Sequence, residues 1–250
     1  MALIPVPVVG IFDDVSGRLI GFSVNGGPGV NFPEGTPKAR LMAYNPVARA
    51  TLAALPTASG QGATSRAIAT NLGPTDMDLV SDGTNWRPAN GEACIKISNG
   101  TVASPVASLA TTGAASLITL PSDISLPPKL IIPNSRIRVE AEFHRSGANG
   151  TITVGAYLGN NKTTADPLLG TVDFTTTQTS LWVEFSARFG SSVNTYYAAT
   201  GTHQKGQGSA SAFADRTIVG ANQAYVSFGS TANVAGDTLT LLGYRVTLEV

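Results

Sequence analysis

A two-residue rhythm of apolar and polar side chains runs through the carboxyl-terminal half of the chain. In the segment 136–143, every second residue is apolar, namely Ile137, Val139, Ala141 and Phe143. The residues between them are all charged, namely Arg136, Arg138, Glu140 and Glu142. Because successive side chains of a β-strand point to opposite faces, this spacing predicts a strand with one buried face and one polar face.

Further short segments of this kind follow, separated by clusters of Gly, Asn, Asp and Thr. They are 151–158, 168–174, 180–189, 194–199, 209–213, 223–228 and 237–250. Segments 136–143 and 151–158 are joined by the turn-forming residues 146–150, and we expect them to form a hairpin. Eight short strands without helices between them predict a β-sandwich, and a jelly roll is the commonest eight-stranded form. The expected class is therefore all-β, with an eight-stranded antiparallel jelly-roll sandwich over residues 93–250.

The last of these segments changes parity once. Leu239 and Leu241 share one parity, whereas Tyr244, Val246 and Leu248 share the other. A single inserted residue restores the inward face, so we predict a β-bulge near Leu242 and Gly243.

The pattern of residues 1–56 predicts an amino-terminal arm. Two apolar runs, 4–12 and 18–24, flank the turn-rich residues 13–17 and predict a β-hairpin. One short helix is expected over 46–55, with Asn45 as its N-cap, Pro46 at its first position and Pro56 as its stop.

Three regions follow from these patterns. Residues 1–56 form an anchoring arm of hairpin plus short helix, residues 57–92 form a linker or small β region, and residues 93–250 form the jelly roll. The tight turn at Asp82 and Gly83 and the following Trp86 close the middle region.

Charge composition excludes several classes of partner. Lys plus Arg and Asp plus Glu each number 16, so no net charge favours nucleic acid or an anionic membrane. Only 13% of residues are charged, about half of the roughly 25% usual for soluble domains, which predicts that much of the surface meets other protein. The start of the chain lacks the pattern of a secretory signal, and no run of about 18 apolar residues predicts membrane insertion. The lone Cys94 is expected to be a buried, unreactive thiol.

Residues able to carry catalysis are few. His144 and His203 are the only histidines, and neither lies in a metal or triad motif. Asp76, Asp78 and Asp82 could suggest calcium, but their spacing does not fit an EF-hand, and we favour turn aspartates.

The acidic pair Glu140 and Glu142 could suggest glycoside hydrolysis. The flanking Arg136 and Arg138 favour instead a charge ladder that faces solvent or another subunit. The sequence therefore predicts no catalytic residues, no metal, no cofactor and no enzymatic activity.

Four residues are candidates for sugar binding: Trp182, Tyr196, Tyr197 and His203. Aromatic faces stack on sugar rings, and indole and hydroxyl groups supply hydrogen bonds. His203 lies in a Gly- and Thr-rich segment typical of an exposed loop. The alternative for the aromatic residues is packing in the core or at a subunit contact. Trp182 has the opposite parity from Leu181, Val183 and Phe185 and is therefore expected to face outward.

Two stretches resemble known proteins. Residues 66–70 and 78–87, which end in the sequence SDGTNWR, resemble a recurring segment of tailed-bacteriophage fibre and virion surface proteins. Residues 130–136, 150–154 and 237–241 resemble the jelly-roll tips of such fibres.

The resemblance implies a structural virion protein on the particle surface, made in the bacterial host cytoplasm. It would assemble as a homotrimer, as a short tail fibre, head fibre or capsid decoration, with residues 1–35 attaching it to other virion proteins. The alternative is a receptor-binding tip that recognises a host cell-surface glycan.

Overall fold

The computed structural model describes residues 8–12, 19–24, 30–31, 48–61, 65–72, 76–199, 213–220 and 222–250. The chain divides into two compact units, Met1–Val47 and Ala48–Val250. The division falls after Val47, so residues 48–56, which the sequence assigned to the arm, belong to the larger unit. No helix among the described residues is long and apolar enough to cross a membrane.

The amino-terminal unit contains a three-stranded sheet in the order β1-β2-β3. Its strands are β1 (Val8–Phe12), β2 (Leu19–Val24) and β3 (Val30–Asn31). Strands β1 and β2 pair antiparallel, with Val8 opposite Val24, so the predicted hairpin is confirmed.

A small four-stranded sheet opens the larger unit, in the order β4-β5-β6-β7. Its elements are β4 (Ala48–Ala50), the 3-10 turn η1 (Leu52–Ala54), α2 (Ala58–Gln61), β5 (Arg66–Ala69), β6 (Met77–Ser81) and β7 (Trp86–Pro88). The predicted helix over 46–55 is wrong where the structure describes it, because Ala48–Ala50 pairs in parallel with β5. Ten residues make a weak isolated helix, and pairing with a neighbouring strand overrides that preference.

The SDGTNWR sequence forms the turn between β6 and β7. The Asp82 carboxylate accepts hydrogen bonds from the backbone N–H groups of Thr84 (2.8 Å) and Asn85 (2.7 Å) and pairs with Arg87. The indole N–H of Trp86 donates to the carbonyl of Pro56 at 2.8 Å. This sequence therefore closes the small sheet and ties it to the segment after η1.

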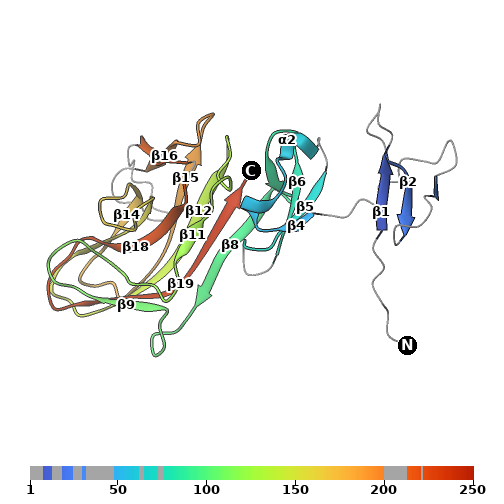
Figure 1. Ribbon diagram of the computed structural model, residues 1–250. Coiled ribbons are helices and arrows are strands. Elements are labelled where there is room, and N and C mark those ends of the chain that lie inside the picture. The colour runs from blue at the N-terminus through green and yellow to red at the C-terminus, as the bar shows by residue number, and fades with distance from the viewer. Residues whose placement is uncertain are drawn as a thin grey trace, which may run out of the picture. The chain divides into compact units, whose positions relative to one another are not determined.

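Residues 92–249 form two larger sheets (Figure 1). The first has seven strands in the order β17-β16-β15-β12-β19-β8, with β9 also paired to β19. Its members are β8 (Glu92–Asn99), β9 (Ala107–Ala110), β12 (Arg136–Ser146), β15 (Ser180–Phe189), β16 (Thr195–Ala199), β17 (Phe213–Thr217) and β19 (Thr238–Glu249).

The second sheet has five strands in the order β10-β18-β13-β14, with β11 also paired to β18. Its members are β10 (Ser116–Leu117), β11 (Ile124–Leu126), β13 (Ile152–Gly159), β14 (Leu168–Phe174) and β18 (Ala224–Ala232).

The apolar faces of these two sheets share one core, as the alternation predicted. Phe143 of β12 meets Phe228 of β18 edge-on, with ring centroids 6.0 Å apart, and Phe228 also contacts Tyr244 of β19. Apolar residues on both inner faces are almost fully buried, among them Ile137, Val139, Val154, Leu158, Val226 and Val246. The all-β class is therefore confirmed.

One predicted pairing is wrong. Segments 136–143 and 151–158 do not form a hairpin, because β12 pairs with β15 and β19 whereas β13 pairs with β14 and β18. Residues 147–151 instead carry the chain from one sheet to the other. Apolar and polar residues alternate only weakly in strands β8 to β11, and these strands were not predicted from the sequence. Of the segment predicted at 209–213, residues 209–212 lie outside the described residues, and Phe213 is the first residue of β17 (Phe213–Thr217).

The predicted bulge in the last strand is confirmed. Along β12, Glu142 lies opposite Gly243 and Phe143 lies opposite Leu241, so Leu242 is the extra residue. This insertion places both Leu241 and Tyr244 in the core.

Candidate functional site

The outer face of the seven-stranded sheet carries a group of charged residues on four neighbouring strands. Strands β8, β12, β15 and β19 contribute Glu92, Arg136, Arg138, Glu140, Glu142, Glu184, Arg188, Arg245 and Glu249. Arg138 lies 2.9 Å from Glu249, and Arg136 lies 3.6 Å from Glu249 and 3.9 Å from Glu184. Arg138 and Arg245 each lie 3.8 Å from Glu92. We call this set the charge ladder.

The paired acidic residues Glu140 and Glu142 lie within this ladder. They lie on the strand face predicted for them, but the arginines pair with Glu92, Glu184 and Glu249 on the neighbouring strands. Glu140 and Glu142 line none of the hollows described below. This placement fits a charged surface better than a pair of catalytic carboxylates in a cleft.

One end of the charge ladder opens into a basin made of two adjoining hollows. The larger, about 610 Å³, is lined by Asn134, Arg136, Ser186, Arg188, Tyr197, Glu249 and Val250. The smaller, about 520 Å³, is lined by Asn134, Arg188, Phe189, Gly190, Ser191, Ser192, Thr195, Tyr196, Tyr197 and Asp215. Since Asn134, Arg188 and Tyr197 line both hollows, we call the whole the Arg188 basin.

Strand register places the side chains of this basin. Arg136 of β12 lies opposite Arg188 of β15, and Arg188 lies opposite Tyr197 of β16. Tyr197 in turn lies opposite Asp215 of β17. The backbone N–H of Asn134 donates to the carbonyl of Gly190 at 2.8 Å and fixes the loops at this end. Four neighbouring strands therefore present an arginine pair, a phenol ring and a carboxylate in one row.

Arg188 differs from the other arginines of the ladder. Arg136, Arg138 and Arg245 each have an acidic partner, whereas Arg188 forms no ion pair with any residue in the described part of the chain. Like charges directly opposite each other on neighbouring strands destabilise a sheet, and Arg136 faces Arg188 in this way.

The two adjacent tyrosines have opposite roles. Tyr197 is 49% exposed, whereas Tyr196 is fully buried against Phe189, with ring centroids 5.6 Å apart. The Tyr196 hydroxyl donates to the carbonyls of Leu158 (3.2 Å) and Pro167 (3.3 Å), and burial raises the pKa of this phenol. Tyr196 therefore ties the two sheets together and follows the alternative of core packing.

The remaining sugar-binding candidates do not join Tyr197. Trp182 is 44% exposed and faces outward as predicted, opposite Glu142. It lies six residues along β15 from Arg188, a separation of about 20 Å at the usual rise of a strand. His203 lies outside the described residues.

The residues that complete the Arg188 basin were missed by sequence reasoning. Arg188 has the parity of Trp182 in the predicted strand 180–189, so its outward direction could have been read from the sequence. Its neighbours could not, because the pairing of β15 with both β12 and β16 joins segments that no local pattern connects.

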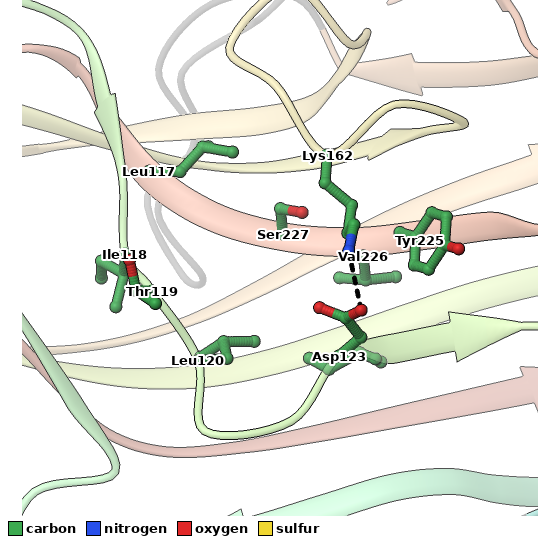
Figure 2. A pocket seen from close by; sticks show the side chains of 10 residues that line it. Leu117, Ile118, Thr119, Leu120, Asp123, Lys162, Tyr225, Val226 and Ser227 are labelled. Carbon is green, nitrogen blue, oxygen red and sulfur yellow. Dashed lines mark hydrogen bonds and ion pairs between the residues drawn. The ribbon is translucent and has the colours of Figure 1, made fainter.

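A third hollow, separate from the Arg188 basin, lies beside β18 (Figure 2). Strands β10 and β11 both pair with β18, and the chain between them loops outward and leaves about 250 Å³ between Leu117, Leu120 and Tyr225. Figure 2 shows Lys162 reaching to Asp123, with the Nζ to Oδ2 distance 2.8 Å. Lys162 also lies 5.0 Å from the centre of the Tyr225 ring. Because its charged groups satisfy each other, this hollow offers a ligand less than the Arg188 basin does.

The other candidate residues have structural surroundings. Asp76 pairs with Arg49 and Asp78 with Arg66, and only Asp82 is a turn aspartate as predicted. His144 lies within β12, which continues past the predicted segment 136–143 to Ser146. Cys94 is half-buried rather than buried. Within the described residues, no group of three or more His, Cys, Asp or Glu side chains could hold a metal ion.

The sequence matches no protein-family model and no curated protein. The fold places the chain in the all-β class. Its function is therefore inferred from the chemistry of its surfaces.

Proposed function

We propose that this chain is a non-enzymatic structural subunit of a bacteriophage particle that assembles as a homotrimer through its carboxyl-terminal domain. The observation that carries the proposal is the outer face of the seven-stranded sheet. There Arg136, Arg138 and Arg245 form ion pairs with acidic residues of neighbouring strands, and Trp182, farther along the same face, leaves 44% of its surface exposed. A large exposed aromatic residue on an extended sheet face fits a surface that a sister chain covers.

The proposal includes a jelly roll for residues 93–250. Strands β8 and β9 together count as the first strand, β10 and β11 as the second, and β12, β13, β14, β15, β18 and β19 as the third to the eighth. In this count the two sheets have the orders 1-8-3-6 and 2-7-4-5, which supports the paired Greek keys of a jelly roll. Strands β16 and β17 then extend the larger sheet beyond its sixth strand.

The virion setting is supported by the SDGTNWR turn and by the two-unit organisation. The turn resembles a segment of phage fibre proteins that precedes a distal domain, and here it lies before β8. A separate unit at Met1–Val47 suits attachment to other virion proteins, as proposed for residues 1–35.

Light scattering on the full-length chain tests the assembly. We expect a mass three times that of one chain, and we expect Trp182→Glu to yield monomers because it places a charge in the contact. Val102→Glu is the matched control, since Val102 is also exposed (57%) but lies in the turn after β8. A monomeric parent protein contradicts the trimer, and a trimeric Trp182→Glu variant contradicts this face.

Purified particles from a host that encodes the chain test the virion location. Mass spectrometry should detect the chain in the particles, and antibodies against it should label the head or the tail in electron micrographs. Hydrolysis of purified host polysaccharide by the chain, lost in Glu140→Gln, would instead show an enzyme.

The second candidate is a glycan-recognising tip for host adsorption, and Tyr197 favours it. Its exposed ring lies beside hydrogen-bonding side chains in the Arg188 basin. Because avidity multiplies weak contacts in a trimer, shallow sites can support adsorption. Tyr197→Ala should reduce adsorption of particles to host cells, and unchanged adsorption removes this site.

A further inference from the structure

We propose that the Arg188 basin binds an acidic sugar, a pyranose with a carboxylate substituent. The Arg188 guanidinium holds the carboxylate and the Tyr197 ring stacks against the sugar. This inference rests on the second proposed function, glycan recognition, and names its ligand class.

The charges of the basin favour an anionic group on the ligand. Arg188 lies opposite Arg136 in the sheet and has no ion-pair partner among the described residues, whereas Arg136 already has Glu184 and Glu249. A carboxylate placed on Arg188 offsets the repulsion between the two guanidinium groups. The planar fork of arginine also matches a carboxylate with two parallel hydrogen bonds.

The rest of the lining favours a sugar over a simple anion. Asp215 and Glu249 line the two hollows, and their negative charges repel phosphate or a polyanion more strongly than a ligand with a single carboxylate. Carboxylates accept hydrogen bonds from sugar hydroxyls, and Ser186 and Asn134 add further polar groups. A ligand with one carboxylate and several hydroxyls can pair with the Arg188 guanidinium and also form hydrogen bonds with these acidic and polar side chains.

Shape and aromatic surface agree with this ligand. Tyr197 borders both hollows with a 49% exposed side chain. The hollows measure about 610 and 520 Å³, within the range of about 300–1,000 Å³ typical of small-molecule sites. Because the two meet at Tyr197 and Arg188, the basin has room for more than one sugar ring.

Calorimetric titration of the full-length chain tests the proposal with defined probes. The acidic probes are glucuronic acid and N-acetylneuraminic acid, the neutral probe is glucose, and the anion probe is inorganic phosphate. We expect at least one acidic sugar to bind at millimolar concentration, at least about tenfold more tightly than glucose and phosphate.

Variants assign the binding to the basin. Arg188→Ala should weaken binding of the acidic sugar about tenfold or more, and Arg188→Lys should recover only part of it because lysine lacks the fork. Tyr197→Ala should weaken binding without changing the preference for the acid. Arg245→Ala is the matched control, since Arg245 is an exposed arginine of the same sheet face outside the basin, and it should bind as the parent does.

The inference is overturned if neither acid binds, if glucose or phosphate binds as tightly, or if both Arg188 variants bind as the parent does. If Arg188→Ala does not fold, two measurements still test the inference. They are the preference of the parent chain for an acidic sugar over glucose and phosphate, and the binding of the acidic sugar by Arg188→Lys. Light scattering on the same samples separates the acidic-sugar inference from the proposed trimer. A trimer that binds no acidic sugar refutes only this inference, and a monomer that binds one refutes only the assembly.

Discussion

Strand β12 carries arginines on both of its faces, and the two faces differ in kind. Arg138 and Arg136 point outward, keep 30% and 41% of their side chains exposed, and pair loosely within the charge ladder. Arg145 points inward at the end of the sandwich, and both its side chain and that of its partner Asp237 are 0% exposed. The outward ion pairs therefore lie on a surface, whereas the inward pair is part of the interior and stabilises the fold.

Every donor of the inward arginine is used. Arg145 pairs with Asp237 through Nε (2.9 Å) and Nη2, donates through Nη1 to the carbonyls of Phe174 and Thr175 (each 3.1 Å), and donates through Nη2 to the carbonyl of Gly150. The Asp237 carboxylate also accepts from the Asn149 side chain at 2.7 Å. This cluster fixes the crossing of the chain between the two sheets at the point where the predicted hairpin failed.

The largest effect should come from breaking this buried pair. Arg145→Ala leaves the Asp237 charge buried without a counterion, and we expect a loss of about 3–5 kcal/mol in the free energy of unfolding. Arg138→Ala on the same strand should cost less than about 1 kcal/mol because its ion pairs are partly exposed to solvent. Urea denaturation followed by circular dichroism measures both.

A double variant sharpens this test. Arg145→Met combined with Asp237→Leu removes both charges and should recover much of the loss seen in Arg145→Ala. Equal losses for Arg145→Ala and Arg138→Ala would show that burial does not separate the two pairs.

The next effect concerns the backbone that surrounds the pair. Gly147 has φ +97°, and a Cβ there would lie 2.0 Å from an Asp237 carboxylate oxygen. Gly147→Ala should therefore lower stability by about 1–3 kcal/mol, through backbone strain and displacement of the carboxylate. Gly113→Ala is the matched control, since Gly113 has φ +91° with no atom within 4 Å of the added Cβ.

Gly113→Ala should lower the free energy of unfolding by about 1 kcal/mol, through backbone strain alone. Thermal unfolding of both variants measures the difference. Equal destabilisation would mean that the Asp237 carboxylate moves aside without cost.

The alternation of apolar and polar residues along single strands predicted part of this fold. Arg145 has the parity of Ile137 and Phe143, so its inward direction follows once the strand is extended past residue 143. Its partner Asp237 lies 92 residues away, and no local pattern links the two. The missed hairpin has the same cause, because alternation gives the face of a residue but not the strand beside it. The opposite faces of Tyr196 and Tyr197, by contrast, follow from alternation alone, since the two are adjacent in one strand.

The same limit applies to the Arg188 basin. Its aromatic member, Tyr197, is a candidate from the chemistry of its side chain, whereas the arginine pair beside it exists only through strand order. Helix signals at Asn45 and Pro46 misled for a related reason, since pairing with β5 decided the conformation of residues 48–50.

A turn carboxylate should give an intermediate effect that depends on pH. The backbone N–H of Asn85, with those of Thr84 and the side chain of Arg87, holds the pKa of Asp82 below its ordinary value, although desolvation opposes the shift. A lowered folded pKa stabilises the fold above the unfolded pKa of about 4, and this contribution is lost as pH falls through the folded pKa.

Asp82→Asn should therefore remove about 1 kcal/mol at neutral pH and progressively less in acid. Trp86 fluorescence in a Trp182→Phe background measures this locally, because Trp86 and Trp182 are the two tryptophans. Asp76→Asn is the control, since among the described residues its carboxylate contacts only Arg49. A variant that keeps the acid sensitivity of the parent would assign that sensitivity to another group.

The smallest effect should come from the charge ladder, and salt distinguishes it from the buried pair. Arg138 pairs with Glu249 and Glu92 at 30% exposure, so Arg138→Gln should cost about 0.5 kcal/mol at low ionic strength. At 1 M salt, where the screening length falls to about 3 Å, that cost should vanish, whereas the cost of Arg145→Ala should persist because no ions reach a buried pair. Urea denaturation of both variants at the two salt concentrations measures this. A salt-insensitive cost for Arg138→Gln would contradict this comparison, because the Arg138 pairs would then be as inaccessible to ions as the Arg145 pair.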